Sequence, residues 1–124
     1  MSELACLELS VLLWLVHVLV AANTTGAPPA YLFSSRDDPP PPVGVIGGRA
    51  ARASRNYMES FPVFAALVLA FLATNHPAGF WPTLWILARI VYLPLYLFDV
   101  IYVRTVAWVI SIIALVAMLI RLAL

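Results

Sequence analysis

Lysine is absent from this chain of 124 residues, and charged residues of either sign make up only 10% of it. So few cations argue against a nucleic-acid partner, because such a surface needs many basic groups to neutralise phosphates. The single cysteine, Cys6, excludes an intrachain disulfide bond. The chain also shows no metal-ligand spacing, no glycine-rich phosphate loop and no nucleophile–His–acid set, so we expect no metal.

Apolar side chains are abundant: 64% of the residues are hydrophobic, and the mean hydropathy is +0.98. A water-soluble core could not bury so much apolar surface, so the natural solvent is lipid. Four apolar segments, at 4–22, about 57–74, 80–102 and 105–124, each approach the roughly 20 residues that a helix needs to cross a bilayer. The sequence predicts an all-α membrane protein, a four-transmembrane-helix bundle with a single domain over residues 1–124.

The connections between these segments differ greatly in length. Residues 23–48 are rich in proline and glycine, and the stretch "DDPPPPVG" is expected to run extended. The second helix is expected to begin near residue 49, and "NHPAG" predicts a tight turn after residue 74. The first segment is preceded by Glu3 and contains Glu8, without a positive charge, so we interpret it as a retained helix rather than a signal peptide.

The arginines predict the orientation in the membrane. Four spans place both termini and the "NHPAG" turn on one side and the connection 23–48 on the other. Arg121 alone lies on the first side, and the second side holds Arg36, Arg49, Arg52, Arg55 and Arg104. The positive-inside rule makes the second side cytoplasmic and leaves the termini outside. Interfacial depth is expected for Trp14, Trp81, Trp85 and Trp108.

Two polar stripes enter the predicted spans. At about 100° per residue, Arg52, Asn56 and Glu59 fall on one face of the helix 49–74. The helix 80–102 carries a matching stripe, formed by Arg89, Tyr92, Tyr96 and Asp99. Ionisable groups at this depth are unfavourable unless they are paired or face water, so a functional site is the default interpretation. Arg104 lies at the start of the last helix, whose dipole favours an anion.

Structural interpretations of the same residues remain open. Arg49 and Arg55 can extend to the interface and only set the topology, and Arg55 can form a plain i,i+4 pair with Glu59. Arg89 and Asp99 can form an ion pair that holds the bundle together. On the first helix, Glu8 and His17 are expected to be packed polar residues rather than ligands.

Two motifs resemble a known family. The stretch "RASRNYMESFP" is similar to the second-helix signature of the MAPEG family, the membrane-associated proteins in eicosanoid and glutathione metabolism. The stretches "ARIVYLPLY" and "VRTVAW" resemble the third helix of that family and the start of its fourth. The similarity covers most of the chain from Arg36 onward, with the motifs in the same order. The long proline-rich connection resembles bacterial members, and Ser60 stands where some eukaryotic members have a tyrosine.

This resemblance implies a homotrimer with glutathione sites between subunits, open to the cytoplasmic side. One protomer is also expected to offer too few partners for four side chains, so that subunits complete each other's sites: Arg49, Arg52, Arg89 and Asp99. Arg104 would lie close to the glutathione sulfur as the catalytic residue. The resemblance implies that glutathione is bound by Arg52, Asn56, Glu59, Arg89, Tyr92 and Tyr96.

The chemistry of glutathione suits these residue types. The molecule carries two carboxylates and one ammonium group, so Glu59 is a natural partner for the ammonium and Arg52 and Arg89 for the carboxylates. A thiol with a pKa of about 8.5 is only slightly ionised at neutral pH, and a nearby guanidinium favours the nucleophilic thiolate. The expected activity is conjugation of glutathione to lipophilic electrophiles, reduction of lipid hydroperoxides, or both.

Two other functions are compatible with the sequence. A small four-helix transporter would use Glu8 as its coupling carboxylate, although such proteins have short connections and residues 23–48 form a long one. A non-catalytic membrane scaffold or ligand-binding protein would keep the same fold without turnover.

Overall fold

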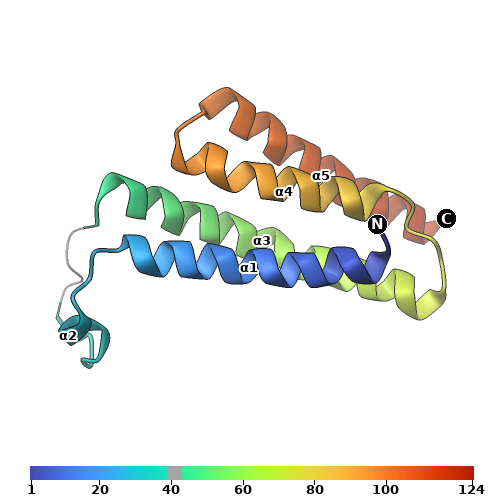
Figure 1. Ribbon diagram of the computed structural model, residues 1–124. Helices are drawn as coiled ribbons and strands as arrows, with labels where there is room; N and C mark the ends of the chain where they lie inside the picture. The colour runs from blue at the N-terminus through green and yellow to red at the C-terminus, as the bar shows by residue number, and fades with distance from the viewer. Residues whose placement is uncertain (39–42) are drawn as a thin grey trace.

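The computed structural model describes residues 1–38 and 43–124, so most of the "DDPPPPVG" stretch lies outside the described residues. The helices in the described residues are α1 (Glu3–Thr24), α2 (Pro29–Leu32), α3 (Val45–Thr74), α4 (Trp81–Leu97) and α5 (Ile101–Ala123). Figure 1 shows α1 lying along α3 and α4 along α5, with the two pairs packed together. Both termini and the α3–α4 turn lie at one end of the bundle, and α2 and the α4–α5 turn lie at the other.

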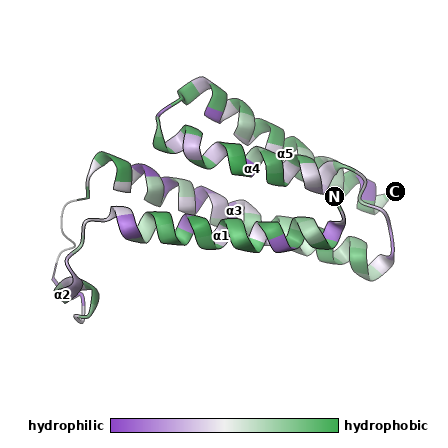
Figure 2. Ribbon diagram, in the orientation of Figure 1, coloured by the Kyte–Doolittle hydropathy of each residue, from purple (hydrophilic) through white to green (hydrophobic). Residues whose placement is uncertain are grey.

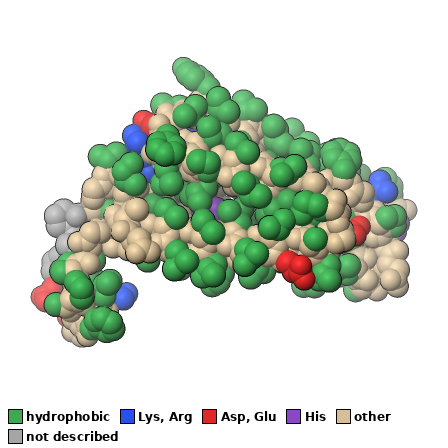
Figure 3. Space-filling model, viewed as in Figure 1, with side chains coloured by type: hydrophobic (Ala, Val, Ile, Leu, Met, Phe, Trp, Pro, Cys, Tyr) green, Lys and Arg blue, Asp and Glu red, His purple; other side chains and the backbone are tan. Residues whose placement is uncertain are grey.

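Three of these helices, α1, α3 and α5, are long and apolar enough to cross a membrane. The fourth long helix, α4, is also apolar but has 17 residues, which gives a length of about 26 Å. Apolar residues run along all four long helices (Figure 2), and apolar side chains cover much of the face seen in Figure 3. Leu12, Leu69 and Leu119, for example, are each more than half exposed. Such a surface is stable against hydrocarbon rather than water, so the chain is a membrane protein.

The predicted helix 80–102 is too long, because α4 ends at Leu97. Asp99 has a left-handed backbone with φ 62, the Asp99 N–H donates to the Tyr96 carbonyl, and the Val100 N–H donates to the Leu95 carbonyl. This is the Schellman arrangement, which satisfies the last carbonyls of a helix and stops it. Asparagine and aspartate tolerate the left-handed conformation better than other non-glycine residues. Asn75, with φ 52, ends α3 in the same way before the turn predicted from "NHPAG".

Stacked aromatic side chains fill the core between the helix pairs. The rings of Phe64 and Trp85 lie 3.9 Å apart and almost parallel, and both side chains are fully buried. Trp85, expected at interfacial depth, therefore packs inside the bundle. Small residues let the helices approach closely: a side chain at Gly47 would collide with the carbonyl of Thr24, where α3 begins beside the end of α1. The core thus fixes α3 against both α1 and α4.

Candidate functional site

Arg89 is a cation in the middle of the bundle, and its side chain is only 1% exposed. It comes from α4, and its guanidinium crosses to α3, where one terminal nitrogen donates to Asn56 Oδ1 at 2.7 Å. The other terminal nitrogen donates to Ser60 Oγ, also at 2.7 Å. Asn56 and Ser60 are four residues apart and therefore share a face of α3. This buried charge is held by two neutral groups, while its Nε has no hydrogen-bond partner in the described chain.

Arg104 is the second cation, and it lies in the first turns of α5. Its guanidinium carbon is 4.4 Å from the centre of the Tyr96 ring, which is a cation–π contact between α5 and α4. The ring of Tyr92 lies 5.5 Å from that of Tyr96 and continues this aromatic wall toward Arg89. The two arginines are thus joined by two tyrosines on consecutive turns of α4.

Asp99 holds the end of α4 to the neighbouring helices. Arg49 of α3 donates to Asp99 Oδ2 at 2.8 Å and also to the Leu97 carbonyl at 3.1 Å. Arg104 is 3.9 Å from the other carboxylate oxygen, which is beyond hydrogen-bonding distance. Because Arg49 takes the close contact, Arg104 keeps most of its capacity to bind another anion.

Two adjoining clefts open along this polar surface. The first has a volume of about 250 Å³ and is lined by Asn56, Tyr92, Tyr96, Arg104, Thr105 and Trp108. The second, of about 220 Å³, is lined by Asn56, Glu59, Ser60, Val63, Arg89, Trp108, Ile112 and Leu115. Asn56 and Trp108 belong to both clefts, so the two spaces meet between these side chains. The first space is lined by polar and apolar surface alike, whereas the second has an apolar floor from α3 and α5.

These clefts combine charges of both signs in a way that suits a zwitterion. Arg89 and Arg104 supply positive charge, and Glu59 supplies an exposed carboxylate at the rim of the second cleft. Within the described residues, every ion pair shorter than 4 Å involves Asp99, so the carboxylate of Glu59 has no such partner. No group of three or more possible metal ligands occurs in the same residues. The site is therefore built for hydrogen bonds and charge pairing.

A comparison with known families decides the assignment: the model of the MAPEG family matches residues 4–124, nearly the whole chain. The chain belongs to the MAPEG family. It is thus a membrane protein of the family of glutathione and eicosanoid metabolism, whose members use glutathione. No curated protein sequence and no solved structure matches the chain.

Most of the residues expected from the MAPEG motifs line the two clefts. They are Asn56, Glu59, Arg89, Tyr92, Tyr96 and Arg104. Arg52 is the exception, because it is exposed and lines neither cleft. Its guanidinium lies back along α3, beside Gly48. A helical side chain leans toward the N-terminus of its helix, which carries Arg52 away from Asn56.

Two of the ion pairs left open by the sequence do not form. Arg89 and Asp99 do not form an ion pair, since Asp99 pairs with Arg49 and Arg104 and Arg89 contacts neutral groups. Arg55 and Glu59 form no ion pair within 4 Å among the described residues. Within the described residues of one protomer, Arg49, Arg89 and Asp99 find partners, whereas Arg52 forms no ion pair within 4 Å.

The two residues of α1 that were expected to be packed, Glu8 and His17, differ in burial. His17 is buried as expected; its Nδ1 lies 2.8 Å from the Leu13 carbonyl, and its ring stacks on Tyr57 at 4.4 Å. Glu8, expected to be packed, is instead exposed on the outer surface. Because Glu8 lines neither cleft, it has no contact with the candidate site.

Sequence reasoning missed Ser60 and Trp108 as members of the site. Ser60 was noted only as a departure from the family pattern, although its spacing from Asn56 places both on one face of α3. Trp108 was interpreted as an interfacial residue, yet it is 38% exposed and forms the wall that both clefts share. Its spacing of four residues from Arg104 is the signal that could have identified it.

Proposed function

We propose that this MAPEG protein is a glutathione-dependent membrane enzyme that conjugates glutathione to lipophilic electrophiles, reduces lipid hydroperoxides, or does both. The observation that carries the proposal is the pair of adjoining clefts, where two arginines and one unpaired glutamate lie beside an apolar floor. A charged tripeptide and a lipophilic partner need these two environments side by side. Family membership supports the same conclusion, because MAPEG proteins use glutathione.

In this proposal the polar residues bind and orient the tripeptide. Glu59 binds its ammonium group, and Arg89 attracts a carboxylate while holding the Asn56 amide in place. Arg52 reaches the second carboxylate after its side chain turns away from Gly48. Tyr92 and Tyr96 line the path between the two arginines and donate hydrogen bonds to the peptide.

Arg104 activates the sulfur. A guanidinium close to a thiol stabilises the thiolate and lowers the thiol pKa, and the N-terminal turns of α5 add positive potential of the same sign. The thiolate sulfur then attacks an electrophilic carbon and forms a thioether while the leaving group, such as chloride, departs with its bonding electrons. With a hydroperoxide, the sulfur attacks the terminal oxygen and forms an S–OH group, the O–O bond breaks, and the alkoxide that leaves takes up a proton to give the alcohol. A second glutathione then reacts with the S–OH group to give the disulfide and water. Val63, Ile112 and Leu115 offer the lipophilic substrate an apolar surface in the second cleft, which adjoins the cleft of Arg104 at Asn56 and Trp108.

The proposed assembly is a homotrimer in which each protomer crosses the membrane four times, with α4 as the shortest span. Two observations support subunits that share sites: Arg52 has no place in the clefts of its own protomer, and Glu59 and Trp108 remain exposed. A neighbouring subunit that covers this face would exclude water from the thiolate. The proposed location is a bacterial inner membrane.

Turnover by the purified protein tests the function. In proteoliposomes, we expect glutathione-dependent consumption of a chlorinated nitrobenzene or a fatty-acid hydroperoxide, with inhibition by an S-alkyl glutathione. Binding of glutathione without turnover of either substrate class would instead identify a ligand-binding scaffold. No binding and no turnover would contradict the proposal.

The orientation has its own test, which uses the exposed position Ser35 in the connection between α1 and α3. A cysteine at Ser35, in a Cys6→Ser background, should resist membrane-impermeant thiol reagents added to spheroplasts and should react after lysis. The physical reason is the arginine excess at this end of the bundle, which the positive-inside rule places in the cytoplasm. Reaction in intact spheroplasts would invert the topology and place the candidate site outside.

A further inference from the structure

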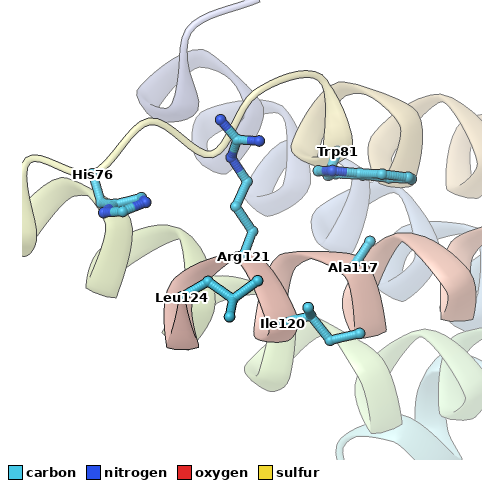
Figure 4. Close-up of a pocket in the computed structure, with 6 residues that line it drawn as sticks. All are labelled: His76, Trp81, Ala117, Ile120, Arg121 and Leu124. Atoms are coloured by element: carbon cyan, nitrogen blue, oxygen red, sulfur yellow. The ribbon is translucent and has the colours of Figure 1, made fainter.

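A third cleft, of about 510 Å³, lies at the end of the bundle opposite the candidate site (Figure 4). It is formed where the last turns of α5 meet the turn between α3 and α4. Arg121 of α5, His76 of the turn and Trp81 of α4 are among the side chains that line it. None of these residues lines the two clefts of the candidate site, so this cleft is a separate space.

Arg121 is fixed in this cleft by the backbone of the turn. Its Nε donates to the Pro77 carbonyl at 2.7 Å, which anchors one edge of the guanidinium and leaves both terminal nitrogens free to donate. The guanidinium also lies against Gly79, where an added Cβ would be 3.6 Å from its central carbon. In Figure 4 the side chain rises from α5 and holds its charged end between His76 and Trp81.

The charge of Arg121 has no carboxylate partner within 4 Å in the described part of the chain. The carboxylate of Glu3, at the same end of the bundle, accepts the N–H of Ala78 at 3.1 Å. A cation with a fixed orientation and two free donors matches the paired oxygens of a phosphate group.

The wall that α5 contributes to the same cleft is apolar apart from Arg121. Ala117 and Ile120 of α5 form this wall beneath the guanidinium, and Ile120 is 55% exposed. Trp81 lies beside them at the end of its helix, the position where tryptophan commonly meets lipid headgroups. A ligand that fills the space needs a charged head and an adjoining hydrocarbon tail.

We propose that this cleft binds an anionic phospholipid, with its phosphate on Arg121 and an acyl chain along Ile120. This site is independent of the proposed glutathione chemistry, because the two share no residue. A bound lipid would tie the end of α5 to the α3–α4 turn through the phosphate. It would therefore stabilise the end of the bundle that the candidate site does not use.

Native mass spectrometry of the full chain, released from mild detergent after lipid exchange, tests the proposal. We expect phosphatidylglycerol to be retained more strongly than phosphatidylcholine with the same acyl chains. Arg121→Gln should lower phosphatidylglycerol retention about fivefold, which corresponds to the roughly 1 kcal/mol of one arginine near an anionic surface. Arg121→Lys keeps the charge but loses the paired N–H donors of the guanidinium, so its phosphatidylglycerol retention should be intermediate.

Arg55→Gln is the matched control, because Arg55 is an exposed arginine at the other end of the bundle. It should leave lipid retention unchanged, and circular dichroism should show that both variants keep their helices. Equal retention by the original chain and Arg121→Gln, or equal retention of the two lipids, would overturn the proposal. A parallel arm adds millimolar inorganic phosphate: displacement of the lipid by free phosphate would show that a soluble anion, not a lipid, is the ligand.

Discussion

Replacing Arg104 with alanine is expected to lower glutathione-dependent turnover about 100-fold, the usual effect of removing a group that stabilises a developing anion. Much of the glutathione binding should remain, since Asn56, Glu59 and Arg89 hold the other parts of the ligand in the proposal. Arg104 stands over the Tyr96 ring and is only loosely held by Asp99, so its charge is available to the sulfur. Removing that charge should leave a bound thiol in place of a thiolate.

The pH dependence of Arg104→Ala shows whether Arg104 activates the thiol of glutathione or only has a structural role. A cation lowers the pKa of a nearby thiol, so its removal raises that pKa and moves the activity to higher pH. Turnover by Arg104→Ala should therefore recover partly in alkaline buffer, while Arg104→Lys should keep more activity near neutrality. Arg55→Ala removes an exposed arginine from the same end of the bundle and should change neither the turnover nor its pH profile. A normal pH profile in Arg104→Ala would show that Arg104 only anchors the topology.

Glu59→Gln is expected to weaken glutathione binding about 30- to 150-fold, equivalent to about 2–3 kcal/mol for a charged hydrogen bond in a partly desolvated site. Glu59 has no ion-pair partner within 4 Å among the described residues, so its carboxylate is free to bind the ammonium group of the ligand. Glutamine keeps the size of the side chain and removes the charge. The measurement is isothermal titration calorimetry in detergent.

Glu8→Gln is the control for this substitution, because Glu8 is an exposed glutamate on α1 outside both clefts. Its effect on the dissociation constant should be negligible. Glutathione that lacks the amino group should bind both the original chain and Glu59→Gln with similar, weak affinity. If Glu59→Gln instead weakened both ligands by the same factor, Glu59 would not be the ammonium partner.

The long apolar helices could be predicted from the apolar runs in the sequence, and three of them are long enough to cross a membrane. Two helix ends, in contrast, depend on local hydrogen bonds. Asp99 lies three residues after Tyr96, so helical periodicity assigns it to the same polar stripe. The structure uses it in a left-handed turn that ends α4 and places its carboxylate between Arg49 and Arg104. Periodicity shows which residues share a helix face and does not show where a left-handed residue ends the helix. Glycine would have indicated such a turn, but aspartate adopts that conformation less readily. The short helix α2 within the connection was not predicted.

Candidate site residues that share a face of one helix could be predicted from the sequence. Contacts between residues on different helices could not. Asn56 and Glu59 share a face of α3, and Tyr92 and Tyr96 share a face of α4, so the 100° spacing found them. The pairing of Arg89 with Asn56 and Ser60 depends on how α4 packs against α3. Trp108 joins the site only because α5 lies across both helices, which no single-helix pattern contains.

The most direct test of the proposed function is the ultraviolet absorbance of glutathione bound to the purified protein. At neutral pH, we expect a thiolate difference band that saturates with glutathione and is absent with S-methyl glutathione. The same band should be lost in Arg104→Ala and kept in Arg55→Ala. Saturable binding without any thiolate band would contradict activation by Arg104, and a folded protein that binds no glutathione would contradict the proposed function itself.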